Sequence, residues 1–171
     1  ELTDRDPVFG VNWYEAITYC RYLSNQAGMP ETAQCYDGPE SLPKDDEGNP
    51  EYEQLYLDRP GFRMPTEAEW EVVCRCGMRT TYAFGGDTTL FGEYGWSSEN
   101  SNQYSHPEGE KRPGPRGLFD MHGNLLEWCH DRYGTYGETT LLVNPLGAAR
   151  GSSRVARGGS WDFRAADCRT A

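Results

Sequence analysis

The chain has 171 residues, which suits one domain large enough to bury a hydrophobic core. It is rich in aromatic residues (5 Trp, 11 Tyr and 6 Phe), and its 20 Gly and 11 Pro indicate many turns and little regular structure. The net charge of −11 argues against nucleic acids and anionic membranes as partners and suits cation binding or plain solubility.

Cysteine and histidine usage argues against two kinds of site. The 6 cysteines are too scattered for a disulfide framework, Cys74 and Cys76 lack Cys-x-x-Cys spacing, and the 3 histidines form no zinc pattern. The lone His122 is expected to be a turn or surface residue, not a catalyst. No signal segment or transmembrane-length apolar run occurs, and Glu1-Leu-Thr-Asp-Arg5 reads as a cut inside a longer protein. We expect reduced thiols and a cytoplasmic location.

A first helix is predicted after Asn12. Asn12 and Glu15 have the spacing of a capping box, and Gly28 stands where the helix would end. The apolar positions recur at helical spacing and are Ala16, Tyr19, Cys20 and Leu23.

A second helix is predicted after Thr66, which forms a capping box with Glu69. Glu71 and Arg75 are spaced to pair across one turn, and Gly77 ends the helix. Its apolar face consists of Trp70, Val73 and Cys74.

Between the helices, residues 31–60 form an acidic, turn-rich stretch around Lys44-Asp-Asp-Glu-Gly-Asn-Pro50. Its carboxylates lack the order of an EF-hand, so a solvated surface insertion is favoured over a metal loop. One arm of an exposed hairpin is predicted at Tyr52, Leu55 and Leu57.

Residues 82–117 are irregular, and such a stretch stays ordered only when it is packed or bound. Five aromatic side chains are expected to hold it: Phe84, Phe91, Tyr94, Trp96 and Tyr104. Strands are predicted at residues 125–129 and 154–161, separated by a Gly-rich excursion over residues 134–151. The composition therefore predicts a loop-rich α+β domain.

Two carboxylates, Asp120 and Glu127, flank a glycine turn. Calcium takes about six to eight oxygens from carboxylates, backbone carbonyls and water, and the carbonyls of Gly123 and Leu125 are available in this turn. These four residues form a candidate calcium site. The alternative is that Asp120 caps the turn while Glu127 pairs with an arginine such as Arg157.

The C-terminal segment contains adjacent glycines, Gly158 and Gly159, at the end of the second predicted strand. Glycines in a strand let another backbone or a ligand approach closely. The alternative is that they only relieve crowding around Trp161 and Trp128.

Four motifs occur in the order Val11-Asn-Trp-Tyr-Glu-Ala16, Arg63-Met-Pro-Thr-Glu-Ala-Glu-Trp70, Gly117-Leu-Phe-Asp-Met-His-Gly-Asn-Leu-Leu-Glu-Trp128 and Arg157-Gly-Gly-Ser-Trp161. In these motifs the chain resembles the formylglycine-generating enzyme family, also called sulfatase-modifying factors. The resemblance implies one C-type-lectin-like α+β domain over residues 1–171, with two helices, a small twisted antiparallel sheet and long calcium-stabilised loops. It also implies calcium binding at Asp120, Gly123, Leu125 and Glu127, and a binding cleft beside Ser160.

The resemblance breaks at the catalytic cysteines. Enzymes of the family oxidise a sulfatase cysteine to formylglycine with oxygen and copper(I), which a cysteine pair holds; a single thiolate leaves that ion under-coordinated. Counted without gaps, Phe163 falls on the first cysteine position and Cys168 on the second. Aligned instead on the following Arg-x-Ala, Cys168 matches neither position, so the cysteine pair is missing in both alignments. Leu126 replaces a tryptophan that many members carry near the catalytic pocket, and the family's last strand is missing after Ala171.

The sequence therefore favours a calcium-stabilised ligand- or protein-binding domain without oxidase activity. Its expected recognition surface consists of Ser160, Trp161, Asp162, Phe163 and Arg164. Relatives without the cysteine pair include domains fused to bacterial kinases or other signalling modules, and variable binding proteins of diversity-generating retroelements. One alternative is a copper-dependent oxidase with Cys168 as a ligand. Another is the scaffold part of a larger enzyme.

Overall fold

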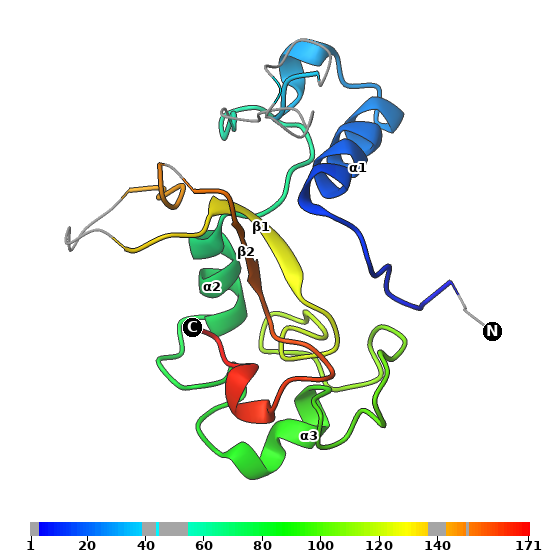
Figure 1. The fold of residues 1–171 in the computed structure, drawn as a ribbon, viewed down its shortest axis with the longest axis vertical. Helices are drawn as coiled ribbons and strands as arrows, with labels where there is room; N and C mark the ends of the chain where they lie inside the picture. The colour runs from blue at the N-terminus through cyan, green and yellow to red at the C-terminus, as the bar shows by residue number, and fades with distance from the viewer. Residues whose placement is uncertain (1–3, 39–43, 45–54, 137–142, 150) are drawn as a thin grey trace. The chain divides into compact units, whose positions relative to one another are not determined.

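The computed structural model describes residues 4–38, 44, 55–136, 143–149 and 151–171 (Figure 1). In this part of the chain, three α-helices, several short 3-10 turns and one two-stranded sheet are joined by long loops, which confirms the predicted α+β class. The contacts divide the chain into two compact units, residues 10–64 and residues 1–9 with 65–171. No helix among the described residues combines the length and apolarity needed to cross a membrane.

The smaller unit contains α1 (Trp13–Gln26) and the 3-10 turn η1 (Glu31–Ala33). The predicted capping box is present, because the Asn12 side chain accepts from the Glu15 N–H at 3.0 Å and the Glu15 carboxylate accepts from the Asn12 N–H at 2.7 Å. The predicted apolar face is partly wrong. Tyr19 is exposed and stacks on Tyr22, whereas the buried residues of the helix are Trp13, Ile17 and Ser24.

The acidic stretch 31–60 belongs to this smaller unit, and much of it lies outside the described residues. That applies to Tyr52, one residue of the predicted hairpin arm. Leu55 is described and is buried, so this end of the stretch packs into its unit and is not simply a solvated surface insertion.

The larger unit is built on α2 (Glu67–Arg75), which begins with the predicted capping box between Thr66 and Glu69. Trp70 and Cys74 are buried, and the predicted Glu71–Arg75 pair forms at 2.6 Å. The helix ends before Gly77, because Cys76 already adopts the left-handed conformation with φ +48°.

The sheet of this unit pairs β1 (Glu127–Arg132) with β2 (Arg154–Arg157) in antiparallel register, with Glu127 opposite Arg157 (Figure 1). The second strand stops short of the predicted residue 161, since Gly158 and Gly159 follow with φ values of +93° and +82°. Strand and helix share one apolar core made of Trp70, Cys74, Ala83, Cys129 and Val155.

The long loops of the larger unit are held by aromatic contacts, as predicted. Phe84 stacks on Tyr94 with ring centroids 4.5 Å apart, and Trp96 stacks on His106 at 3.6 Å. These loops also include the short helix α3 (Phe91–Tyr94), which the sequence analysis did not predict. Figure 1 shows the C-terminal segment beside α3, where Cys168 packs with Phe91 and Tyr82.

Candidate functional site

The turn between Asp120 and Glu127 is built from left-handed residues. Asp120, Gly123 and Asn124 have φ values of +58°, +89° and +61°. Only glycine fits at position 123, because a Cβ there would lie 1.8 Å from the Trp96 carbonyl oxygen. The sequence thus folds this segment back tightly against the loop that contains Trp96.

Both candidate carboxylates are held by hydrogen bonds inside the larger unit. One Asp120 oxygen accepts from the Gly109 N–H at 2.9 Å, whereas its other oxygen, Oδ1, is buried without a hydrogen-bond partner. Glu127 accepts from the indole N–H of Trp70 at 2.6 Å. A buried carboxylate oxygen without a partner loses its hydration without compensation, so this position favours a donor or a cation.

The electrostatics of Asp120 and Glu127 also favour a bound cation. Burial raises the pKa of Asp120, and burial followed by the charge of Asp120 raises the pKa of Glu127 to about 7. Two carboxylates whose charged forms are disfavoured by desolvation and mutual repulsion are stabilised by a cation placed between them.

A cavity of about 680 Å³ opens at these carboxylates. Asp120, Asn124, Leu125 and Glu127 line it together with residues of the N-terminal segment and of the loop around Gly109. Gly123 is not among the lining residues; its N–H donates to the Gly158 carbonyl at 2.7 Å. The structure thus places three of the four predicted metal-site residues on one cavity.

These residues fit calcium better than a transition metal. Among the described residues, no three His, Cys, Asp or Glu side chains lie close enough to hold an ion by themselves. Two carboxylates supplemented by backbone carbonyls and water are instead the oxygen donors that calcium uses. Asp120 and Glu127 would hold the ion and the Leu125 carbonyl would be an additional ligand.

The alternative ion pair between Glu127 and Arg157 does not form in the described part of the chain. Arg157 lies opposite Glu127 in the sheet, but its guanidinium contacts Glu71 at 3.3 Å and Glu67 at 3.8 Å and donates to the Thr170 carbonyl at 2.7 Å. Arg157 therefore connects α2 to the C-terminal segment, and Glu127 hydrogen-bonds to Trp70 instead.

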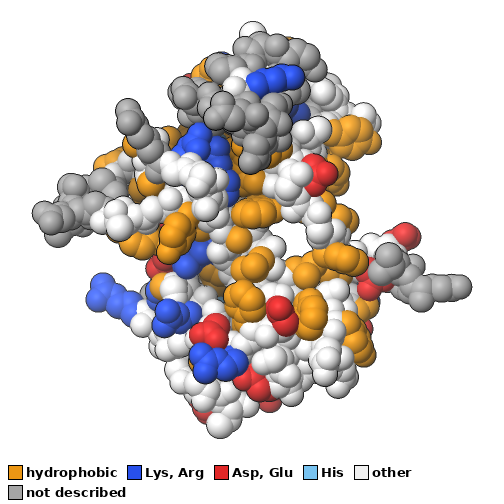
Figure 2. All heavy atoms as spheres, in the orientation of Figure 1, with side chains coloured by type: hydrophobic (Ala, Val, Ile, Leu, Met, Phe, Trp, Pro, Cys, Tyr) orange, Lys and Arg blue, Asp and Glu red, His pale blue; other side chains and the backbone are white. Residues whose placement is uncertain are grey.

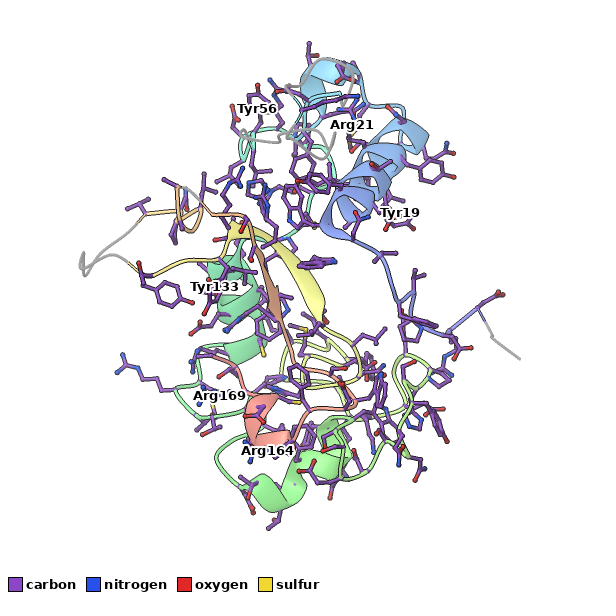
Figure 3. All side chains as sticks on the ribbon, in the orientation of Figure 1. Tyr19, Arg21, Tyr56, Tyr133, Arg164 and Arg169 are labelled. Carbon is purple, nitrogen blue, oxygen red and sulfur yellow. The ribbon has the colours of Figure 1, made fainter. Side chains whose placement is uncertain are left out.

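The predicted recognition residues divide into two groups. Ser160 is buried and its hydroxyl donates to the Asn124 carbonyl at 3.4 Å, while the N–H of half-buried Trp161 donates to the same carbonyl at 2.8 Å. Asp162, Phe163 and Arg164 are exposed. Figure 3 shows Arg164 on this segment and Arg169 further along the chain, and Figure 2 shows basic side chains interspersed with acidic and hydrophobic ones on this face. We call Ser160–Arg164 the recognition segment.

The recognition segment is braced by a loop that the sequence analysis did not single out. The Ser98 N–H donates to the Phe163 carbonyl at 2.8 Å, and the Ser101 hydroxyl donates to the Trp161 carbonyl at 2.9 Å. The Glu99 carboxylate accepts from the Ala165 N–H at 3.1 Å. The dense Ser/Glu/Asn composition of Trp96-Ser-Ser-Glu-Asn-Ser101 was the available signal, since such residues bond to nearby backbone.

Cys168, the one candidate copper ligand, is fully buried. Its sulfur lies 2.5 Å from where a Cβ on Gly159 would stand, so this glycine is needed to make room for the thiol. Burial raises the pKa of Cys168 to about 11, which keeps it protonated at neutral pH. Copper(I) binds the thiolate, so its binding here would have to displace a more tightly held proton than at a free cysteine.

His122 lies in the predicted turn but is not a surface residue. It is 3% exposed, its Nε2 accepts from the Ala83 N–H at 3.0 Å, and its Nδ1 donates to the Cys168 carbonyl at 2.9 Å. Burial lowers its pKa, so the ring is neutral. His122 joins three segments that are distant in sequence, a role visible only in three dimensions.

Comparison with known proteins gives consistent results. A sequence profile of the sulfatase-modifying factor enzyme 1-like domain matches residues 1–171. The chain is 36% identical over 120 residues to a serine/threonine-protein kinase pkn1 from Chlamydia pneumoniae, covering 68% of this chain and 19% of the kinase. It is 35% identical over 119 residues to a formylglycine-generating enzyme from Streptomyces coelicolor, covering 62% of this chain and 38% of that enzyme.

Among solved structures, the Treponema denticola variable protein 1 superposes with a TM-score of 0.83 at 30% identity, over 99% of this chain and 65% of that protein. PvdO from Pseudomonas aeruginosa superposes with a TM-score of 0.66 at 21% identity, over 99% of this chain and 56% of that protein. The fold is therefore the C-type-lectin-like α+β fold expected from the motifs. The chain spans only part of the length of each of these relatives.

Proposed function

The chain belongs to the family of sulfatase-modifying factor enzyme 1-like domains, and we propose that it is a calcium-stabilised member that binds a ligand or a protein instead of oxidising a cysteine. Relatives that match this domain over part of their length include formylglycine-generating enzymes, kinases and a variable protein, so the family alone does not decide the activity. The residues of the site support binding over oxidation.

One observation carries the calcium site. The Oδ1 oxygen of Asp120 is buried without a partner, and its carboxylate shares a cavity with Glu127. In the absence of a cation this arrangement is costly, because two desolvated carboxylates repel each other and one oxygen is unsatisfied. A calcium ion removes both costs.

The metal site and the recognition segment are joined by Asn124. Its carbonyl accepts from Trp161 and Ser160, while its side chain accepts from the His106 N–H at 2.9 Å and donates to the His106 carbonyl at 3.0 Å. Calcium bound at Asp120 and Glu127 would therefore hold in place the turn to which the recognition segment is hydrogen-bonded.

The mixed side chains of the recognition segment suit a protein or small-molecule ligand. The likeness to the Treponema variable protein favours a variable binding protein as the more specific candidate. The six free thiols are compatible with a reducing compartment, and we place the domain in the cytoplasm of a bacterium.

Thermal melting with calcium or with a chelator tests the calcium site. We expect calcium to raise the melting temperature, by several degrees if it contributes about 1–2 kcal/mol. Glu127→Gln is expected to lose most of this rise, because an amide oxygen is a neutral and weaker ligand. Glu108→Gln, which removes a carboxylate from the same cavity, is the control and should retain the rise. An unchanged melting temperature in calcium would show that Asp120 and Glu127 are only structural.

A further inference from the structure

The cavity at Asp120 and Glu127 has an apolar rim. Val8, Phe119 and Leu126 line it, and their exposed fractions are 79%, 45% and 46%. Single exposed apolar residues are normal on a protein surface, but three large ones gathered at one cavity are typical of a binding site. Pro7 and Leu125 extend this apolar lining.

The size of the cavity also exceeds what an ion needs. Its volume of about 680 Å³ lies within the range of pockets that hold small organic molecules. A calcium ion and the oxygens around it fill only a fraction of such a space. Room remains for an organic molecule that reaches from the ion to the rim.

The charged groups that line the cavity indicate which class of molecule it binds. Three carboxylates line the cavity (Glu108, Asp120 and Glu127) against one guanidinium, that of Arg5. With these groups ionised the cavity carries excess negative charge and repels anions. A divalent cation compensates this excess. Two side chains and the Leu125 carbonyl supply fewer than the roughly six to eight oxygens that calcium takes, so the remaining positions are open to water or to a ligand.

We propose that this cavity binds a small carboxylic acid with an apolar body, whose carboxylate contacts the bound calcium and whose apolar part packs on Val8, Phe119 and Leu126. The proposal rests on the calcium site proposed above. A carboxylate supplies the hard oxygens that calcium prefers, and its single charge leaves the rest of the molecule free to enter an apolar rim. Binding is thus expected only when calcium is present.

Titration calorimetry with octanoate as the probe, in calcium and in chelator, tests this proposal. We expect binding in calcium and its loss in chelator. Octylammonium, which has the same chain length and the opposite charge, is expected not to bind in calcium. Equal binding of octanoate in chelator, or binding of octylammonium in calcium, would overturn the assignment of ligand class.

The Leu126→Trp variant distinguishes binding at the apolar rim from binding of the calcium ion. The larger ring fills the cavity mouth, so octanoate affinity should fall at least tenfold while the calcium-induced rise in melting temperature persists. Leu90→Trp places the same ring at a comparably exposed leucine outside the cavity and should change neither. Phe119→Ser removes apolar surface without adding bulk and should also weaken octanoate binding. It tests the same rim if the tryptophan variant misfolds.

The two proposals fail in different ways. If calcium raises the melting temperature of the wild-type protein and octanoate still does not bind, the carboxylate site is wrong and the calcium site stands. If calcium has no effect on melting, both are wrong.

Discussion

Asp131 shows how a single buried polar residue is tied to the fold of the larger unit. It is 2% exposed, and its Oδ2 accepts from the Glu67 N–H at 2.8 Å, at the first residue of α2. This bond satisfies one of the N–H groups that a helix start leaves without a partner. The helix dipole favours the charge, yet burial dominates and raises the pKa of Asp131.

The raised pKa gives a prediction with a definite sign. Because the folded protein holds the Asp131 proton more tightly than the unfolded chain, this residue disfavours folding as pH rises through its folded pKa. Asp131→Asn keeps an oxygen acceptor without the charge, so at neutral pH it should be at least as stable as wild type. The advantage should vanish in acid, where the wild-type carboxyl is itself neutral.

Urea denaturation at several pH values measures this difference. Asp131→Ala should lose about 1–3 kcal/mol, since it leaves the Glu67 N–H without its acceptor. The exposed Asp167, which pairs with Arg164, is the control: Asp167→Asn should change stability by less than about 1 kcal/mol. A destabilised Asp131→Asn at neutral pH would show that the helix end needs the charge.

Among the elements, the turn of residues 120–127 links the candidate calcium ligands to the C-terminal segment. It carries the candidate calcium ligands at its ends and, near its middle, Asn124, which bonds to the recognition segment and to His106. A cation bound at both ends of a short turn would restrict the motion of the turn and of the residues hydrogen-bonded to it. The order of the recognition segment should therefore depend on calcium.

Residue-resolved hydrogen exchange tests this dependence. Calcium is expected to slow exchange of the Trp161 amide, which donates to the Asn124 carbonyl at 2.8 Å. The Ala27 amide, which donates to the Leu23 carbonyl at 3.0 Å at the end of α1 in the smaller unit, is the internal control and should change less. A calcium-stabilised protein in which Trp161 exchanges at an unchanged rate would contradict the coupling.

Two substitutions of Asn124 separate the loss of its side-chain hydrogen bonds from the strain of its left-handed backbone. Asn124→Gly tolerates the φ of +61° and loses only the two side-chain bonds to His106, for an expected cost of about 1–2 kcal/mol. Asn124→Ala adds the strain of a left-handed alanine, roughly 1–2 kcal/mol more. Denaturant unfolding should rank wild type, glycine and alanine in that order; equal stability of the two variants would show that backbone strain is not a factor.

At the scale of the whole molecule, the fold and the proposed activity are separate questions. The same domain type occurs in relatives named as enzymes and in one named as a variable protein. Here the thiol that would have to bind copper is fully buried behind Gly159. Oxidation of a peptide cysteine would require that segment to open.

This gives a prediction for activity. Incubation with copper and a peptide containing Cys-x-Pro-x-Arg should leave the peptide cysteine intact, as mass spectrometry would show. A formylglycine product that disappears in Cys168→Ala would establish the oxidase instead. Cys129→Ala, at another fully buried thiol, controls for general loss of structure in that comparison.

The sequence by itself determined the starts of the two longer helices and the family. Both capping boxes form as predicted, because their bonds join residues three apart, and the ordered motifs predicted the fold. Which helix face is buried, as for exposed Tyr19, depended on packing that no local pattern contains.

Only the tertiary structure decided which distant groups meet. In the folded protein, Arg157 pairs with Glu67 and Glu71 and not with Glu127. His122 is buried and hydrogen-bonds to Ala83 and Cys168, which are distant in sequence. Apolar side chains line the cavity beside Asp120. The physical reason is that burial and hydrogen bonding across many residues fix these contacts. Sequence spacing sets no distance between groups that long loops bring together.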